Sequence, residues 1–168
     1  MWEYASGSYL KNKFHNQIQE AYSDDLINKS ILEDKFLYFK NEFNEFNNTY
    51  DTTFKYFFIN LYQILKYIDT YAENKESGKE YANMLRAQLT KNELVLLAYN
   101  AIGVQNFTTK NYQKLVEKYE FFEHLRYEDF CDNPNLIAIN TSVLQKYQAS
   151  AFGSNVKLIE EITKQSSE

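Results

Sequence analysis

Glycine and proline are scarce in this chain: its 168 residues include four glycines and one proline. Because these two residues punctuate turns and interrupt helices, their scarcity leaves long stretches free to be helical. Alternating runs of β-branched residues, which are typical of strands, are missing as well. We therefore predict an all-α protein whose architecture is a multi-helix bundle.

Cysteine is almost absent too. Cys131 is the one cysteine, so an internal disulfide is excluded, and a lone thiol is typical of a reducing compartment. It cannot build a structural zinc site alone, and neither His15 nor His124 has a cysteine or a second histidine at metal-binding spacing. The glycine-rich loops that cradle phosphates are also lacking. The sequence predicts no metal, no cofactor and a cytoplasmic location.

Arginine is rare, and acidic residues outnumber basic ones. Arg86 and Arg126 are the two arginines, and 18 basic residues against 23 acidic ones give a net charge of −5. Binding of nucleic acid without sequence preference requires a basic field, so no nucleic acid is expected as a partner. Long apolar runs are missing: the N-terminus lacks a signal-peptide core, and residues 56–65 are too few to span a bilayer. The chain as given is expected to be soluble.

Aromatic residues, by contrast, are abundant, at 17% of the chain, with 15 tyrosines and 13 phenylalanines. These side chains bury large areas, and tyrosine keeps a polar tip that needs a partner. The apolar content of 44% is enough for a core, and the length favours one domain. We expect a single helical domain over residues 1–168, with frayed ends at 1–8 and 165–168.

Helix signals follow one another along the chain. A first helix is expected over Ser8–Tyr22, with Leu10, Phe14 and Ile18 at four-residue steps. Ser/Thr-x-x-Glu capping boxes mark three further starts, at Ser30–Glu33, Ser77–Glu80 and Thr90–Glu93. The later helices are expected at 78–89, 91–102, 111–125, within 141–147 and within 155–164. Gly103 is expected as the C′ glycine of the helix at 91–102. The region 126–140, around Pro134, is expected to be irregular.

The longest pattern begins after Ser30. Mostly aromatic residues recur there at steps of three and four, at Phe36, Phe39, Phe43, Phe46, Tyr50, Thr53, Phe57, Asn60, Ile64, Tyr67 and Tyr71. This heptad-like seam predicts a long aromatic-rich central helix or a helical hairpin. Because residues 47–49 are weak helix formers and Asp51 suits an N-cap, we expect a kink or short break near Asn48–Asp51.

The stretch from Leu85 to Gly103 mixes polar side chains with an apolar run, whose expected buried stripe is Leu94, Leu97 and Ala101. Arg86 either extends to solvent along its own stem, binds a ligand or phosphate, or forms an ion pair between helices. We favour the ion pair, and the carboxylates considered as its partner are Glu93, Glu117 and Asp69. Gln88 and Asn100 lie among apolar neighbours, where each needs a polar partner.

A candidate polar cluster follows from these residues, and its members are His15, Arg86, Gln88, Glu93, Tyr99 and Asn100. Ribonucleases of the helical HEPN fold usually use an arginine followed a few residues later by a histidine. Arg86 has no such histidine after it, and Arg126 follows His124 instead of preceding it. The motif is absent, and no catalytic residue is assigned.

Three segments together resemble a known family. They are "FFINLYQILKYID" (57–69), "YANMLRAQLTKNELVLLAYNAIG" (81–103) and "YQKLVEKYEFFEHL" (112–125). With "FHNQI" (14–18) upstream, residues 14–125 resemble the putative phage abortive infection protein family. The resemblance implies a bacterial or prophage-borne protein of defence against phage. Members of that family often carry two transmembrane helices ahead of this region, so it also implies a parent protein anchored through a segment absent from this chain.

Three hypotheses stay open on the sequence. The leading one is a non-enzymatic sensing or protein-interaction domain that binds a phage or host protein, or another copy of itself. The second is an effector enzyme, a nuclease or nucleotide-acting toxin, with a site around Arg86 and Asn100. The third is a self-association module that uses the Phe/Tyr seam.

Overall fold

The computed structural model describes residues 7–25, 35–103, 107–130 and 136–165. In these ranges the chain forms helices and turns without a strand, which confirms the all-α prediction. The elements in order are α1 Gly7–Asp25, α2 Lys35–Thr49, α3 Asp51–Tyr71, α4 Lys75–Arg86, α5 Lys91–Gly103, α6 Phe107–Lys118, α7 Tyr127–Phe130, α8 Ile137–Leu144, the 3-10 helix η4 Ala149–Phe152 and α9 Val156–Gln165.

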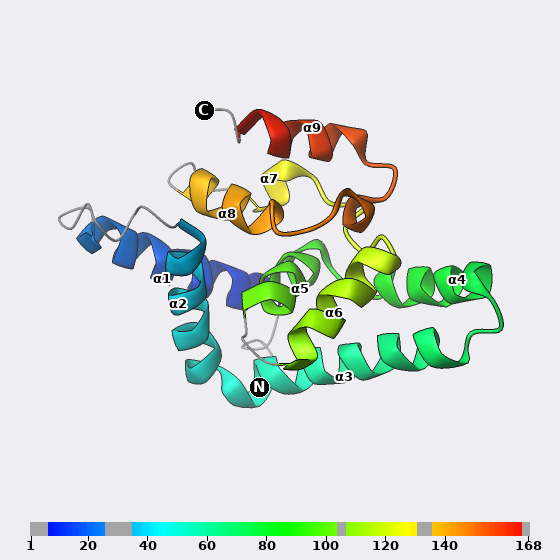
Figure 1. The fold of residues 1–168 in the computed structure, drawn as a ribbon. Helices are drawn as coiled ribbons and strands as arrows, with labels where there is room; N and C mark the ends of the chain where they lie inside the picture. The colour runs from blue at the N-terminus through cyan, green and yellow to red at the C-terminus, as the bar shows by residue number, and fades with distance from the viewer. Residues whose placement is uncertain (1–6, 26–34, 104–106, 131–135, 166–168) are drawn as a thin grey trace.

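Helix α5 lies in the middle of the molecule (Figure 1). Every residue from Leu94 to Ala101 is buried, because α1, α2, α6, α7 and α8 all pack against this helix. A helix that is apolar all round is stable in water only when it is covered on every side. The stripe of Leu94, Leu97 and Ala101 expected from the sequence is therefore one part of a larger buried surface.

An aromatic cluster joins α1, α2 and α5. Tyr99 of α5 is fully buried, and its ring centroid lies 5.4 Å from that of Phe14, 5.3 Å from Phe39 and 6.4 Å from Phe43. The rings of Phe14 and Phe43 meet edge to face at 5.1 Å. Such pairs contribute about 0.5–1.5 kcal/mol each beyond the area they bury. Aromatic side chains thus hold the N-terminal helices α1 and α2 against the central helix α5.

The break expected near Asn48–Asp51 is confirmed. Helix α2 ends at Thr49 and α3 begins at Asp51, with one residue between them. Asp51, however, is not the N-cap: Tyr50 occupies that position and makes no side-chain capping bond. The amide of Tyr50 still donates to the carbonyl of Phe46 at 3.0 Å, and the two rings lie 4.7 Å apart. The two helices therefore change direction over a very short turn.

The aromatic seam predicted through both helices is right for α2 and wrong for α3. Phe39, Phe43 and Phe46 are buried. In α3 the seam positions Phe57, Ile64, Tyr67 and Tyr71 are exposed, and the core receives a different stripe, consisting of Phe58, Leu61, Tyr62, Leu65 and Ile68. The turn at Tyr50 rotates the second helix relative to the first, so a continuous seven-residue pattern in the sequence does not stay on one side.

Two of the three predicted capping boxes can be compared with the structure. The box at Thr90 is confirmed: its amide donates to Glu93 Oε2 at 2.8 Å, and the Glu93 amide donates to Thr90 Oγ1 at 3.3 Å. The box at Ser77 is wrong, because Asn74 is the N-cap and accepts from the Ser77 amide at 2.8 Å. Helix α4 thus starts three residues earlier than expected. The box at Ser30–Glu33 lies outside the described residues.

Gly103 is the last residue of α5 and not a C′ glycine with a left-handed backbone, as had been expected. A Cβ atom at this position would lie 2.6 Å from Cδ1 of Phe43. The absence of a side chain therefore lets α2 and α5 approach closely.

Helix α6 is shorter than the predicted 111–125 because it ends at Lys118. Glu120 then adopts a left-handed backbone, with φ of 53°, and the Phe121 amide donates back to the Val116 carbonyl at 3.1 Å. This is a Schellman-type helix end, usually made by glycine, and sequence reasoning had no glycine to detect it by.

The C-terminal third of the chain packs against α5 through α7 and α8. The region 126–140, predicted to be irregular, contains α7 and the start of α8, whereas Cys131 and Pro134 lie outside the described residues. Tyr147 follows α8 and donates its hydroxyl proton to the Ala98 carbonyl of α5 at 2.5 Å. Of the ends expected to fray, Gly7, Ser8 and Gln165 are helical, and 1–6 and 166–168 are outside the described residues.

Candidate functional site

Helix α3 presents apolar side chains to solvent along the face opposite its buried stripe. We define the α3–α4 face as Tyr56, Phe57, Ile64, Tyr67 and Tyr71 of α3, with Tyr81 and Met84 of α4. Tyr71 is 69% exposed, Tyr67 65% and Met84 64%. Single exposed apolar residues are ordinary, but a contiguous exposed group of large ones is typical of an interaction surface.

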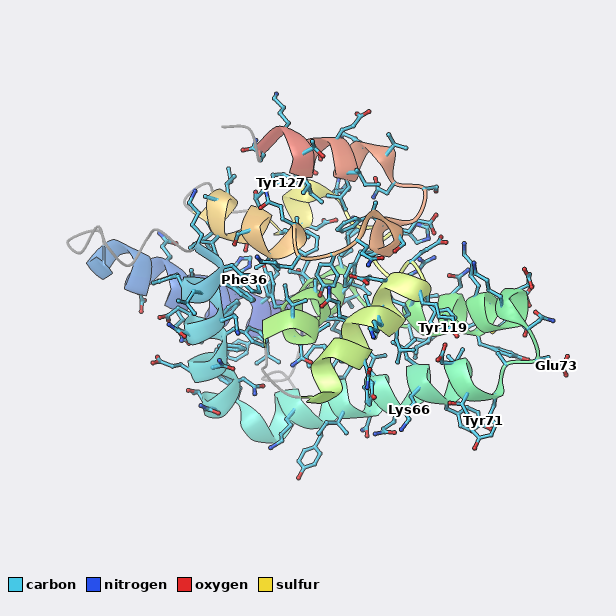
Figure 2. All side chains as sticks on the ribbon, in the orientation of Figure 1. Phe36, Lys66, Tyr71, Glu73, Tyr119 and Tyr127 are labelled. Atoms are coloured by element: carbon cyan, nitrogen blue, oxygen red, sulfur yellow. The ribbon has the colours of Figure 1, made fainter. Side chains whose placement is uncertain are left out.

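Part of this face is hollowed. A cleft of about 390 Å³ lies between the end of α3 and α4, and its lining residues are Tyr67, Ile68, Tyr71, Ala72 and Tyr81. The rings of Tyr67 and Tyr71 lie 4.7 Å apart at 39°. Figure 2 shows Tyr71 at the far end of α3, next to the turn that carries Glu73. Three tyrosines and two aliphatic residues, and no charged side chain, therefore line this cleft.

The other side of α3 is fixed to α6 by Asp69. Its Oδ1 accepts from Lys118 Nζ at 2.5 Å and from the Tyr119 hydroxyl at 3.0 Å. Burial, followed by the hydrogen bond and negative charge of Asp69, raises the pKa of Tyr119 to about 12. The phenol thus stays a proton donor at neutral pH, and it holds α3 with its exposed aromatic residues turned away from the core.

Arg86 is buried, with 7% of its side chain exposed, and it bonds across to the turn that follows α6. Its Nη1 donates to the Glu120 carbonyl at 2.8 Å, and Glu123 Oε2 lies 3.4 Å from the same nitrogen. Its Nη2 donates to His124 Nε2 at 3.1 Å, so that nitrogen carries no proton in this arrangement. An ion pair, the favoured interpretation, is present, but it joins α4 to a turn and not to a second helix.

The partner of Arg86 is not one of the three carboxylates that the sequence suggested. Asp69 is bound to Lys118, Glu93 caps the start of α5, and Glu117 accepts from the side chain of Gln113 and the amide of Gln148. The actual partner, Glu123, lies in a turn that had been expected to be helical. A wrong helix end therefore led to the wrong partner.

His15 and Tyr99, two of the candidate residues, are in direct contact. The Tyr99 hydroxyl donates to Asn140 Oδ1 at 3.0 Å and lies 3.1 Å from His15 Nε2, which must therefore be the donor in that pair. Asn140 Nδ2 donates in turn to the Phe130 carbonyl at 2.6 Å. All four residues are buried. This chain of hydrogen bonds links α1, α5, α8 and α7, and sequence reasoning missed Asn140 because Ile137–Leu144 carried no helix start signal.

The remaining candidates lie elsewhere. Glu93 serves the capping box of α5, and Gln88 is exposed, contrary to the buried setting expected for it. Asn100 is buried on α5, with 9% exposed. Two clefts in the described part of the chain, of about 390 Å³ and about 240 Å³, are lined by none of the six candidate residues. The structure thus brings His15 and Tyr99 together and places Arg86 in a separate cluster.

The comparison with protein families falls on the same part of the chain. Residues 49–130 match the family of putative phage abortive infection proteins. The match confirms the resemblance drawn from the sequence and supports a role in antiviral defence; the upstream element at 14–18 lies outside it. No curated protein and no solved structure matches the chain.

This abortive-infection segment, residues 49–130, contains α3 to α7 complete. The α3–α4 face, the cleft and the Arg86 cluster all lie within it, whereas His15 and Asn140 lie outside. Within the described ranges, no helix combines the length and apolar character needed to cross a bilayer.

Proposed function

We propose that this chain is a protein-interaction domain of phage defence and that the α3–α4 face is its recognition surface. The observation that carries the proposal is that α3 is apolar on two opposite sides. One side builds the core through Phe58, Leu65 and Ile68, and the other faces solvent. Exposing such an apolar surface to water is unfavourable in free energy. Its presence on a long helix that is held to the core is best explained by a partner protein that covers it.

The composition of the face supports a protein as that partner. Tyrosine and methionine are enriched at protein–protein interfaces, and lysine and glutamate are depleted there. Between Tyr56 and Tyr71, the charged residues of α3 are Lys66 and Asp69, and Asp69 is already bound to Lys118. The setting we propose is the cytoplasm of a bacterial cell, where the domain recognises a phage or host protein.

A plaque assay with the full-length gene tests the proposal. Phe57→Asp, Ile64→Asp and Tyr67→Asp each place a charge on the face. Phe57→Asp also removes a ring contact with Phe58 of the core stripe, at 4.9 Å, so its stability is the most important of the three to measure. Val156→Asp is the matched control, since Val156 is 61% exposed on α9, outside the abortive-infection segment. We expect the three face variants to lose protection while circular dichroism and melting stay near wild type, and the control to protect fully. Full protection by all three well-expressed face variants would overturn the proposal.

The enzyme hypothesis has a separate test. Purified protein is incubated with RNA, DNA and nucleotides, and Arg86→Lys is compared with wild type. If the wild-type protein cleaves one of these substrates and the folded Arg86→Lys variant does not, the function is catalysis and not binding. Sedimentation at several concentrations examines self-association: a dimer that Ile64→Asp dissociates would identify the partner as a second copy of the chain.

A further inference from the structure

We propose that the cleft lined by Tyr67, Ile68, Tyr71, Ala72 and Tyr81, here called the tyrosine cleft, binds one arginine side chain of the partner protein. The inference rests on the proposed function, because it names the chemistry that the α3–α4 face recognises. Three of the five lining residues are tyrosines, and the cleft volume of about 390 Å³ is large enough to admit a guanidinium beside them. Planar guanidinium groups stack on aromatic faces and are attracted by the ring quadrupole.

The position of the cleft on α3 adds an electrostatic reason. Helix α3 has 21 residues and ends at Tyr71, with Ala72 as its C-cap. The Ile68 carbonyl accepts from the Ala72 amide at 3.0 Å, but the later carbonyls at a helix end have no amide of the same helix to bind, and the aligned peptide dipoles place a partial negative charge at this end. The last turn of α3 contains no basic residue that would neutralise it. A cation bound between Tyr71 and Ala72 is therefore favoured over an anion or a neutral group.

The lining of the cleft itself is free of positive charge, because none of its five residues is basic. Glu73 is exposed in the turn directly after the helix (Figure 2), and the nearest basic residue that follows it, the exposed Lys75, begins α4 and does not line the cleft. The net charge of −5 also favours the approach of a positively charged segment. Gly78 of α4 is needed for the shape, because a Cβ there would lie 3.3 Å from that of Ala72. The close packing at this glycine brings Tyr81, one turn later on α4, to the cleft.

The test uses N-acetyl-arginine-N-methylamide as the probe and the corresponding citrulline compound, which is neutral and nearly the same shape, as its control. Protein with ¹³C-labelled tyrosine rings is titrated and followed by NMR. We expect the arginine probe to shift the signals of Tyr67, Tyr71 and Tyr81, and the citrulline probe to leave them unchanged. Each exposed ring removed should weaken binding roughly two- to fivefold.

Variants connect the signals to the cleft. Tyr71→Leu and Tyr81→Leu should each weaken arginine binding, whereas Tyr56→Leu should not, because Tyr56 is 63% exposed on the same helix but does not line the cleft. Equal shifts with citrulline, equal weakening by Tyr56→Leu, or no shift with arginine would each overturn the inference.

The two proposals fail in different ways. If Phe57→Asp and Ile64→Asp abolish protection while the arginine probe does not bind, the face is kept and only the arginine site is rejected. If the face variants protect fully, the proposed function is rejected, whatever the titration shows. If arginine binds but Tyr71→Leu and Tyr81→Leu protect as wild type, the cleft does not serve recognition in defence, and the inference is rejected.

Discussion

Arg86 donates from Nη1 to the backbone carbonyl of Glu120 at 2.8 Å, and Glu120 is the described non-glycine residue with a positive φ. A guanidinium on α4 therefore binds the backbone two residues beyond the end of α6. The C-terminal end of a helix favours a positive charge, and a left-handed non-glycine residue persists only where its surroundings hold it. The buried arginine thus fixes a helix end that the local sequence would not make unaided.

Replacing this arginine is expected to destabilise the fold. Arg86→Ala should lower the free energy of unfolding by about 2–4 kcal/mol, because it leaves the part-buried Glu120 carbonyl and Oε2 of Glu123 without this donor. Arg86→Lys should cost less but still be destabilising, since one ammonium cannot replace two guanidinium nitrogens. The other arginine supplies the control: Arg126 is 65% exposed, and Arg126→Ala should change stability by under about 1 kcal/mol. Urea unfolding measures all three, and equal losses at both positions would contradict the assignment.

Glu123 predicts a dependence of stability on acid. The hydrogen bond from the Ser154 hydroxyl, at 2.7 Å, lowers the pKa of Glu123 against the opposing effect of burial, helped by the Ser154 amide and the charge of Arg86. Because the folded pKa lies below the unfolded one, this contribution is fully present above the unfolded value of 4.5 and is lost as pH falls through the folded value.

Glu123→Gln should therefore be less stable than wild type at neutral pH, with the difference shrinking in acid. Ser154→Ala should reduce the same acid dependence, whereas Ser150→Ala, at an exposed position nearby, should leave it as in wild type. Unfolding curves measured across the acid range check this. A constant difference between Glu123→Gln and wild type at every pH would be inconsistent with the lowered pKa.

Two buried tyrosines should respond in opposite ways to loss of their hydroxyls. Tyr99→Phe leaves His15 and Asn140 without their shared partner and should cost about 1–3 kcal/mol. The hydroxyl of Tyr112 has no hydrogen-bonding partner among the described residues. Tyr112→Phe should consequently be neutral or stabilising, within about 1 kcal/mol. Denaturant unfolding of the two variants measures both changes. A loss of stability larger than about 1 kcal/mol in Tyr112→Phe would show that the Tyr112 hydroxyl does have a partner.

Gly103→Ala should destabilise the protein even though alanine is the better helix former. The gain in helix propensity is about 1 kcal/mol, and forcing a methyl group against the Phe43 ring should cost about 1–3 kcal/mol. Phe43→Leu should lessen the penalty, so the double variant is expected to be more stable than the sum of the two single changes. Melting temperatures of the four proteins complete this cycle. If the effects of the two single changes on stability simply add, the Cβ atom at position 103 and the Phe43 ring do not contact each other.

The sequence was informative wherever one local signal had a single interpretation. Scarce glycine and proline predicted the helical class, and Thr90 with Glu93 marked the start of α5 because each satisfies the other's amide. It misled where two patterns competed. Both stripes of α3 are apolar, so periodicity alone could not choose between Leu65 and Ile64 for the core. At α4 the signal at Ser77 predicted the helix start, whereas the structure uses Asn74 as the N-cap.

The candidate site shows a further limit. Arg86 was recognised as a buried arginine, but its partner depends on the turn at Glu120, where an acidic residue takes a conformation that normally indicates glycine. His15 and Tyr99 were both candidates, yet the amide that joins them to the C-terminal helices, on Asn140, lies 41 residues from Tyr99 in the chain. Contacts of that kind depend on the complete fold and leave no local pattern.

The burial of α5 on all sides has a consequence for the abortive-infection segment. Its cover comes in part from α1, α2 and α8, which lie before or after residues 49–130 apart from the last residue of α2. Amide hydrogen exchange in α5 should therefore be among the slowest in the whole chain and become fast in a fragment cut at 49 and 130. The abortive-infection segment is thus shorter than the stretch whose helices cover α5.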